Sequence, residues 1–216
     1  MRTLSLLIFS ILLIVGCSSE AQKTDEKKLT DQQLSKLSTA YFAAGCFWHE
    51  EALFESVKGV KEAVSGYAGG FTNDPSYRSI ESGNTGHAES VKLYYDPSAI
   101  SYADLLKVYF TGQDPTQVNG QGPDLGTQYR SIAFYSNDAE KKQIDAYIQK
   151  MTASGKYKAP IAAEVGPMKK FWVAEDYHQD YIKHNPNQGY VQAVSIPEIK
   201  HFQKQYPEMI KPGYTY

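Results

Sequence analysis

The chain has 216 residues, with 22 Lys and Arg, 24 Asp and Glu, and a formal net charge of −2 at pH 7. This length suits one domain with a sizeable core and is short for two full domains. Neither the net charge nor its distribution suits the binding of a polyanion such as nucleic acid, because the sequence has no basic stripe interleaved with aromatic residues. We therefore expect a single folded domain with no nucleic-acid partner.

The first 16 residues have the composition of a signal peptide. Arg2 supplies a positive charge, and an apolar run from Leu4 to Val15, too short to span a bilayer comfortably, follows it. The ending IVGC resembles a bacterial lipoprotein signal, in which the cysteine is lipidated. We expect an exported protein, anchored to a membrane through Cys17 on the extracytoplasmic side (periplasm or cell surface). An ordinary secretory signal with an incidental cysteine is the alternative.

Residues 17–38 are expected to be the lipidated N-terminus and a flexible tether, because positions 18–38 are polar, charged and free of aromatic side chains. The folded domain is then expected over residues 39–216. Exported domains normally use disulfides, yet Cys46 is the only cysteine in this one. That thiol is either a buried, inert side chain or one that is present for its reactivity.

Beyond the tether, alternating and helical hydrophobic patterns succeed one another. In chain order they predict a strand over 39–45, a helix over 46–59, strands over 60–70 and 87–97, a helix over 101–112, a strand over 129–135 and a helix over 137–155. Short strands around 160–165 and 170–174 and a short helix near 176–184 are expected next. The tail from Asn185 contains four prolines, and we expect it to be mostly irregular and to wrap the surface.

The predicted order through residue 135 is β-α-β-β-α-β, the split βαβ arrangement of ferredoxin-like folds. It implies an α+β fold, a ferredoxin-like two-layer sandwich with helices on one face of the sheet and a long irregular C-terminal tail. In this topology the first and third strands are neighbours. Residues at the start of the third strand are therefore expected near the end of the first, where Cys46 follows Gly45.

Cys46 stands at the beginning of the first predicted helix. Unpaired backbone N–H groups and the positive end of the helix dipole favour a thiolate over a thiol at such a position. Cysteines at helix N-termini can have pKa values well below 8.5. Phe47 and Trp48 follow directly, which suggests an apolar reactant. We expect Cys46 to be a nucleophile with a lowered pKa.

Four polar residues are candidates to share this site. Glu89 lies two residues into the third strand, and Tyr67 lies in the glycine-rich turn that ends the second. Asp124 and Tyr129 precede the fourth strand. Each has an ordinary explanation as well, because a strand glutamate can face solvent and most tyrosines are packing residues with a wet hydroxyl. Spacing alone does not decide between these roles.

Five sequence blocks occur in one order along the chain: GCFW, GYAGG, SGNTGHAE, DPTQ…GPDLGTQYRS and AEDYHQ. In order and spacing they resemble the peptide methionine sulfoxide reductases of the A type. One block would be modest evidence, whereas five in register are highly specific, and they cover about residues 40–190. The resemblance implies an enzyme that reduces methionine sulfoxide, on the S epimer by the family's habit, since each epimer has its own enzyme.

The resemblance also implies a role for each candidate residue. Cys46 would be the nucleophile, and Glu89 would be the acid that protonates the sulfoxide oxygen. Tyr67 and Tyr129 would donate hydrogen bonds to that oxygen, and Asp124 would be a supporting polar residue near the thiol. An acid in this role has to be neutral, so we expect Glu89 to be partly buried with a raised pKa.

Phe47 and Trp48 would hold the S-methyl group of the substrate. We expect no bound cofactor and no metal, because the five histidines form no HExxH pattern and one mature cysteine cannot build a thiolate zinc site. His178, in the AEDYHQ block, is expected to have a structural hydrogen-bonding role rather than a catalytic one.

The chain departs from the family at a position after a GY pair, where many members have a further cysteine. Val191 stands there, which implies a one-cysteine type whose sulfenic acid is reduced by an external thiol. A thioredoxin-like protein, a glutaredoxin-like protein or a small thiol could serve. Smaller departures are His49, where glycine is frequent, and Gln113, where histidine often precedes DPT.

Two other functions are compatible with a lone exported thiol. A one-cysteine thiol peroxidase also forms a sulfenic acid, although it needs no apolar methyl pocket. A non-enzymatic lipoprotein that binds peptides or sugars through aromatic residues would not depend on Cys46. We expect the reductase, acting as a monomer on methionine sulfoxide, free or in peptides and proteins, and repairing oxidised exported proteins.

Overall fold

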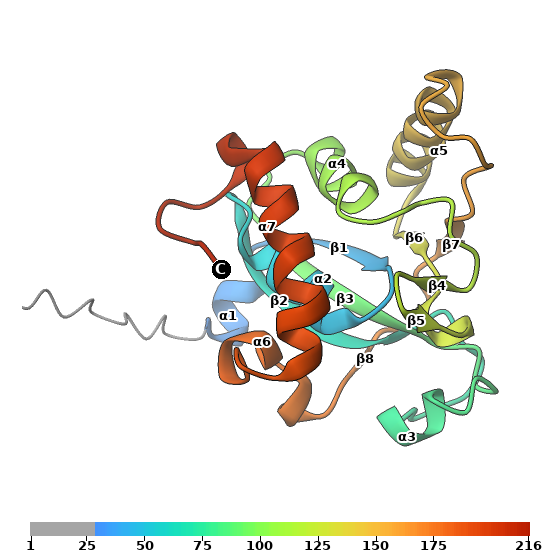
Figure 1. The fold of residues 1–216 in the computed structure, drawn as a ribbon, viewed down its shortest axis with the longest axis vertical. Coiled ribbons are helices and arrows are strands. Elements are labelled where there is room, and N and C mark those ends of the chain that lie inside the picture. The colour runs from blue at the N-terminus through green and yellow to red at the C-terminus, as the bar shows by residue number, and fades with distance from the viewer. Residues whose placement is uncertain (1–28) are drawn as a thin grey trace, which may run out of the picture.

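The computed structural model describes residues 29–216, so the predicted signal peptide (1–16) and Cys17 lie outside the described residues. The fold is a mixed α/β fold built around a six-stranded sheet of order β7-β6-β1-β3-β2-β8 (Figure 1). The strands of this sheet are β1 (Ser38–Ala43), β2 (Val60–Ala68), β3 (Ala88–Tyr95), β6 (Ile132–Tyr135), β7 (Glu164–Pro167) and β8 (Trp172–Val173). A separate hairpin consists of β4 (Gly120–Gln121) and β5 (Asp124–Leu125).

Most neighbouring strands of the large sheet are antiparallel. β1 pairs in this sense with β3 and β6, β2 pairs with β3 and β8, and β7 is parallel to β6. The predicted adjacency of the first and third strands is confirmed, since Phe42 in β1 lies opposite Val91 in β3. On the other side of β3, Glu89 lies opposite Tyr67 in β2. The sheet thus brings the end of β1 to the beginning of β3.

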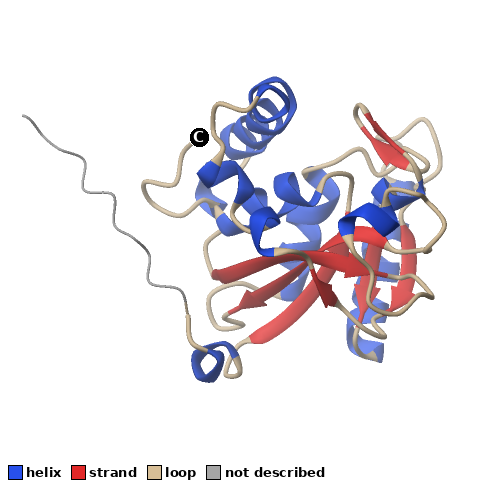
Figure 2. Ribbon diagram, turned by 90° about the horizontal axis from the view of Figure 1, so that it is seen from below, coloured by secondary structure: helices blue, strands red, loops and turns tan. Residues whose placement is uncertain are grey.

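The helices are α1 (Asp31–Leu34), α2 (Phe47–Glu55), α3 (Tyr77–Ile80), α4 (Tyr102–Thr111), α5 (Asp138–Ala153), α6 (Tyr181–His184) and α7 (Ile196–Gln205). Figure 2 shows most of them gathered on one side of the sheet, and in Figure 1 α7 crosses in front of α2. Fully buried side chains join these layers: Phe42 from β1, Leu53 and Phe54 from α2, Leu105 from α4 and Phe202 from α7. Burial of each contributes about 1.5–3 kcal/mol, so α2 is held firmly against the sheet.

The C-terminal tail differs from the prediction, because it is largely helical rather than irregular. It forms α7, preceded by a π-helical turn over Val191–Ser195. Ile196, Ile199 and Phe202 recur at three-residue spacing and are buried against the core. Pro197 lies in the first turn, where its missing N–H has no intrahelical partner to lose. The prediction was wrong because it treated this proline as a helix breaker.

Two shorter segments also differ from the prediction. The helix expected near 176–184 is a 3₁₀ turn over Asp176–His178 followed by α6. Part of the predicted flexible tether forms α1, where Thr30 and Gln33 make a capping box. Among the described residues, no helix has the length and apolar character needed to cross a membrane.

Candidate active site

Cys46 is the N-cap residue of α2 and follows β1 through a glycine turn. Gly45 has φ +66°, where L side chains are strained, and a Cβ there would lie 2.6 Å from the Cβ of Gln121. The N–H of Gly45 donates to the carbonyl of Tyr129 at 3.0 Å. These contacts fix the start of α2 and leave Cys46 8% exposed.

Glu89 is hydrogen-bonded to the backbone of Phe47, the residue next to the thiol. Its Oε2 accepts the backbone N–H of Phe47 at 2.9 Å, one of the N–H groups that the first helical turn leaves unpaired. Glu89 is 2% exposed. Burial raises the pKa of Glu89 to about 8, the charges of Asp124 and Glu81 add to the rise, and the bond from Phe47 opposes it. The expected raised pKa is confirmed, and most of this carboxyl is protonated at neutral pH.

The pKa of the Cys46 thiol is raised, in contrast to the lowering that the helix position predicts. Burial raises it most, and the negative charges of Glu89 and Asp124 raise it further, while the N–H groups of Trp48 and His49 act in the opposite direction. The prediction was wrong because it counted the helix terminus without the desolvation and the two carboxyls. The resting site therefore holds a thiol beside a carboxylic acid.

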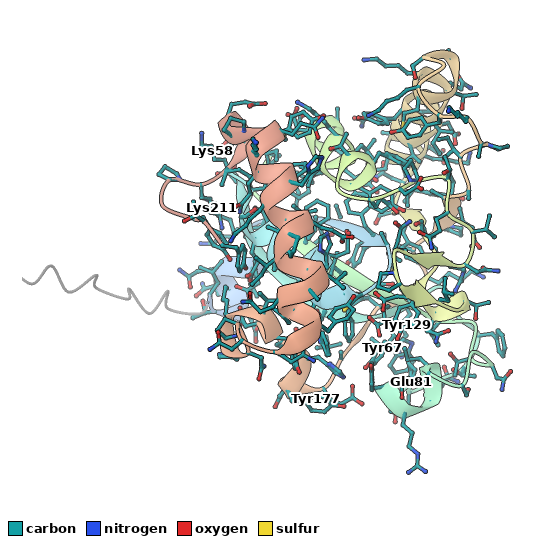
Figure 3. All side chains as sticks on the ribbon, viewed as in Figure 1. Lys58, Tyr67, Glu81, Tyr129, Tyr177 and Lys211 are labelled. Atoms are coloured by element: carbon teal, nitrogen blue, oxygen red, sulfur yellow. The ribbon has the colours of Figure 1, made fainter. Side chains whose placement is uncertain are left out.

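Tyr67 is engaged differently from its predicted role. Its hydroxyl donates to Oε2 of Glu175 at 2.7 Å, and Oε1 of the same carboxylate accepts the backbone N–H of Tyr77 at 3.0 Å. A phenol has a single proton, so Tyr67 cannot donate to a ligand oxygen while this bond holds. Figure 3 shows Tyr67 and Tyr129 next to each other, on the side of the molecule where Glu81 is labelled. Through Glu175, Tyr67 instead fixes the start of α3.

Tyr77 also belongs to the site. The sequence has 17 tyrosines, and nothing in it distinguishes Tyr77 from the others. It opens α3, and its ring centroid lies 6.4 Å from that of Phe47. Burial raises the pKa of Tyr77, and the charges of Glu89, Tyr129 and Cys46 add to the rise. Its ring thus packs on the residue after the thiol, and its phenol is within the electrostatic influence of the buried acid and the thiol.

Tyr129 lies near the same groups, as its place in the sequence suggests. Burial raises the pKa of Tyr129, and the negative charges of Glu89, Asp124 and Cys46 raise it further. At neutral pH both Tyr129 and Tyr77 keep their protons and can donate hydrogen bonds. The site thus has two free phenols, Tyr77 and Tyr129, whereas the sequence predicted Tyr67 and Tyr129.

The two aromatic residues after the thiol pack into a cluster of rings. The ring of Phe47 is buried, 5.9 Å from that of Tyr67 and 4.9 Å from that of His178. Trp48 stacks on Tyr181 at 3.7 Å, and its Nε1–H donates to Nδ1 of His178 at 3.0 Å. Burial lowers the pKa of His178, which favours the neutral imidazole that accepts this bond. This hydrogen bond agrees with the structural role expected of His178.

Asp124 and Tyr190 form a second polar group at the thiol. The hydroxyl of Tyr190 donates to Oδ2 of Asp124. Burial raises the pKa of Asp124, and this hydrogen bond opposes the rise. Burial, the charge of Cys46 and the bond to Asp124 all raise the pKa of Tyr190. Tyr190 was not predicted, because the sequence analysis used the GY pair only to locate the position of a further cysteine. Val191 stands at that position and is fully buried.

Comparisons with known proteins agree with this geometry. The family model for peptide methionine sulfoxide reductase matches residues 38–210. A peptide methionine sulfoxide reductase MsrA from Natronomonas pharaonis is 44% identical over 173 residues, which are 80% of this chain and 97% of that protein. Another, from Polynucleobacter asymbioticus, is 40% identical over 188 residues, which are 87% of this chain and 99% of that protein.

Solved structures give the same result at lower sequence identity. Methionine sulfoxide reductase A of Corynebacterium diphtheriae is 34% identical, with a TM-score of 0.62 over 69% of this chain and 76% of that one. Mxr1 of Saccharomyces cerevisiae in reduced form is 34% identical, with a TM-score of 0.64 over 70% of this chain and 87% of that one. From the family match, these relatives and the thiol beside a buried acid, it follows that the chain belongs to the peptide methionine sulfoxide reductase family and is an oxidoreductase of the MsrA type.

Proposed function

We propose that this protein reduces methionine S-sulfoxide, free or in proteins, by attack of the Cys46 sulfur on the sulfoxide sulfur. The observation that supports this most directly is the buried carboxyl of Glu89, bound to the N–H of Phe47 at 2.9 Å and therefore adjacent to Cys46. Its raised pKa keeps a proton available at neutral pH. A sulfoxide sulfur is electrophilic only when its oxygen is polarised or protonated, and a neutral carboxylic acid supplies that proton.

The two phenols near this acid complete the polar part of the proposed site. Tyr77 and Tyr129 donate hydrogen bonds to the sulfoxide oxygen as negative charge develops on it. Cys46 attacks, Glu89 gives its proton to the oxygen, and the oxygen ends on the Cys46 sulfur as a sulfenic acid while methionine leaves. The thiol proton restores the proton of Glu89, so the thiol and the sulfoxide account for every atom of the two products.

The apolar part of the proposed site follows from the residues after the thiol. Phe47 and Trp48 form one wall with the ring cluster around His178, and we assign the S-methyl group of the substrate to them. Trp48 is fixed by its stacking on Tyr181 and by its bond to His178. A rigid apolar surface of this kind distinguishes a methyl sulfoxide from hydrogen peroxide, which has no methyl group to bind.

The reaction needs an external reductant and no bound cofactor. Cys46 is the only free cysteine among residues 29–216, so the proposed enzyme is a one-cysteine type. A thiol attacks the sulfenic acid to give a mixed disulfide and water, and a second thiol releases Cys46. A thioredoxin-like protein or a small thiol supplies the electrons.

The proposed setting is extracytoplasmic, with the enzyme anchored through a lipid on Cys17 and repairing oxidised exported proteins as a monomer. The IVGC ending of the apolar N-terminal run supports this proposal. Replacing Cys17 with Ser should release the protein from the membrane fraction. The finer description of the fold is the ferredoxin-like split βαβ unit, which the strand order β6-β1-β3-β2 and its antiparallel pairs support.

A single-turnover experiment tests the proposed function. The protein is mixed with a methionine sulfoxide peptide, and methionine is counted before any reductant is added. We expect about one methionine per enzyme and one added oxygen atom on Cys46, with neither in the Cys46→Ser variant. Absence of methionine from the unaltered protein would end the proposal.

A further inference from the structure

A pocket of about 580 Å³ opens beside Cys46. It is lined by the start of α2, by the loops that follow α4, and by α7, which crosses in front of α2 in Figure 1. Cys46 and Asp124 line it, whereas Glu89, Tyr77 and Tyr129 do not. Pockets that bind small molecules commonly have about 300–1,000 Å³. A second small reactant can therefore reach the sulfur from this side without displacing the groups assigned to the sulfoxide.

One wall of the pocket contains a buried polar group without a partner. Glu50 is 1% exposed and lines the pocket, and neither of its carboxyl oxygens has a hydrogen-bond partner. Leaving such a group unsatisfied destabilises the folded protein. A ligand that donates hydrogen bonds into the pocket would satisfy Glu50.

The charges of the pocket favour a cation. Its ionisable lining residues are four carboxyls, two histidines, the thiol and one phenol: Glu50, Asp114, Asp124, Glu198, His49, His201, Cys46 and Tyr190. None of the described lining residues is a lysine or an arginine. Burial lowers the pKa of His49 to about 4, so this imidazole is neutral at neutral pH. Burial raises the pKa of Glu50, so this carboxyl acts as a hydrogen-bonding group, and the negative charge comes from the other three carboxyls. An anionic ligand would meet like charge from these three, and a cationic one would meet opposite charge.

The spacing along α2 limits the size of the ligand. Glu50 lies one helical turn after Cys46, and its N–H bonds to the carbonyl of Cys46 at 3.4 Å. Side chains separated by one turn lie about 5–6 Å apart. A ligand whose sulfur reaches Cys46 therefore places a nitrogen two carbons away within reach of Glu50.

We propose that this pocket binds an aminothiol, a small thiol with an ammonium group, as the reductant of oxidised Cys46. The proposal rests on the proposed function, which supplies the sulfenic acid. The thiol sulfur bonds to Sγ of Cys46 as the S–O bond breaks, and the oxygen leaves as water. A second aminothiol attacks the mixed disulfide, which returns the Cys46 thiol and releases an aminothiol disulfide. Two thiols are oxidised and one sulfenic acid is reduced.

Three thiols of matched length test the proposal: cysteamine, 2-mercaptoethanol and 3-mercaptopropionate carry an ammonium, a hydroxyl and a carboxylate group. The full chain is first oxidised with one equivalent of sulfoxide peptide, and loss of the sulfenic acid is then followed with each thiol at low salt. Rates are divided by those of the same thiols toward a small disulfide in solution, which removes their intrinsic reactivity. We expect cysteamine to exceed 3-mercaptopropionate by roughly tenfold.

Two variants connect this preference to the pocket. Glu198→Lys reverses a charge in the lining, and we expect it to lower the ratio of cysteamine to 3-mercaptopropionate by roughly fivefold or more. Glu50→Leu removes the unpartnered carboxyl and should lower the ratio of cysteamine to 2-mercaptoethanol. Glu208→Lys is the matched control, since Glu208 is at least as exposed as Glu198 and does not line the pocket. It should leave both ratios unchanged.

Each outcome has a distinct meaning. Ratios that are the same in Glu198→Lys and Glu50→Leu as in the unaltered protein would overturn the aminothiol site. A slowing of methionine formation that exceeds any change in the thiol ratios would also overturn it, because the pocket would then take the sulfoxide. Absence of the methionine burst in the unaltered protein, seen before any thiol is added, is the failure of the proposed function instead.

Discussion

Two buried glutamates lie near the same thiol and differ in what surrounds them. Glu89 is 2% exposed and Glu50 is 1% exposed, and burial raises the pKa of both. Glu89 accepts the N–H of Phe47, whereas the oxygens of Glu50 have no partner. Desolvation alone therefore does not define an acid catalyst. A proton donor also needs a fixed orientation, which Glu89 has, while Glu50 is a group that a ligand can satisfy.

The largest expected effect comes from removing the acidic proton of Glu89. Glu89→Gln still accepts the N–H of Phe47 through its amide oxygen but has no acidic proton, so methionine formation should slow by about 10²–10⁴-fold. The KM for the sulfoxide peptide should change little, because the hydrogen bond and the apolar wall remain. The measurement is the rate of the single-turnover burst. A burst of unchanged rate at neutral pH would remove Glu89 from this role.

The same carboxyl predicts how the burst depends on pH. Only the protonated form of Glu89 can donate, and its pKa is about 8. The proton-donating fraction is therefore present below about pH 8 and is lost by about tenfold for each further pH unit. Above that pH the loss of this proton opposes the gain in rate from thiolate formation, so the slope of the rate against pH should decrease. Glu89→Gln should lack this inflection. An inflection that persists in Glu89→Gln belongs to another group.

The next effect separates two tyrosines. Tyr77→Phe removes a phenol near Glu89 and should lower the burst rate by about 10²–10³-fold, the usual effect of losing one donor to a developing oxyanion. Tyr67→Phe removes only a hydrogen bond to Glu175, so we expect a smaller loss, about tenfold or less. Both rates come from the single-turnover burst. A larger loss in Tyr67→Phe than in Tyr77→Phe would restore the original assignment.

These tyrosines show how far the sequence determines the site. The pairing of β1 with β3, which brings Glu89 to Cys46, follows from a topology rule and could be predicted. Which phenol is free could not be predicted, because it depends on Glu175, which lies 108 residues from Tyr67 and accepts the hydrogen bond of its hydroxyl. Local pattern identifies elements and candidate residues, whereas hydrogen-bond partners from distant segments decide which candidate is available.

Burial around the thiol depends on distant segments in the same way. His49, Glu50 and Glu51 are polar and would normally lie on a solvated helix face, yet all three are buried because α6 and α7 cover α2. The sequence predicted an irregular tail, so it could not predict this cover. The raised pKa of Cys46 has the same origin, since burial is its largest cause. The effect of the helix dipole on this pKa is local and could be predicted, but the effect of burial is larger.

A smaller effect concerns stability, where Glu89 acts against the fold. Glu89 has a folded pKa of about 8 and an unfolded value of about 4.5, so folding takes up a proton between these values and stability falls as pH rises through that range. At pH 7 this amounts to about 3 kcal/mol, and at pH 5 to less than about 1 kcal/mol. Glu89→Gln should therefore be more stable at pH 7 by about 3 kcal/mol, and this gain should nearly vanish at pH 5.

Urea denaturation at the two pH values measures this difference. A change in packing does not involve the proton of Glu89, so it would alter the stability equally at both pH values. An equal gain at pH 5 and pH 7 would mean that the substitution acts through packing rather than through the proton. No gain at either pH would mean that Glu89 is ionised in the folded protein.

The smallest expected effect compares Glu50 with its neighbour. Glu51 is also buried, but it accepts the hydroxyl of Ser65 at 2.9 Å and the N–H of Asp180 at 3.1 Å. Glu51→Leu leaves those two donors unsatisfied, whereas Glu50→Leu leaves none. Burial raises the pKa of both carboxyls, so both variants also remove a proton-uptake penalty at pH 7, and their difference reports the hydrogen bonds. We expect Glu50→Leu to be the more stable of the two by about 1–3 kcal/mol in urea denaturation. Equal stability would mean that Glu50 has a partner in solution, and it would remove the unsatisfied carboxyl on which the aminothiol site depends.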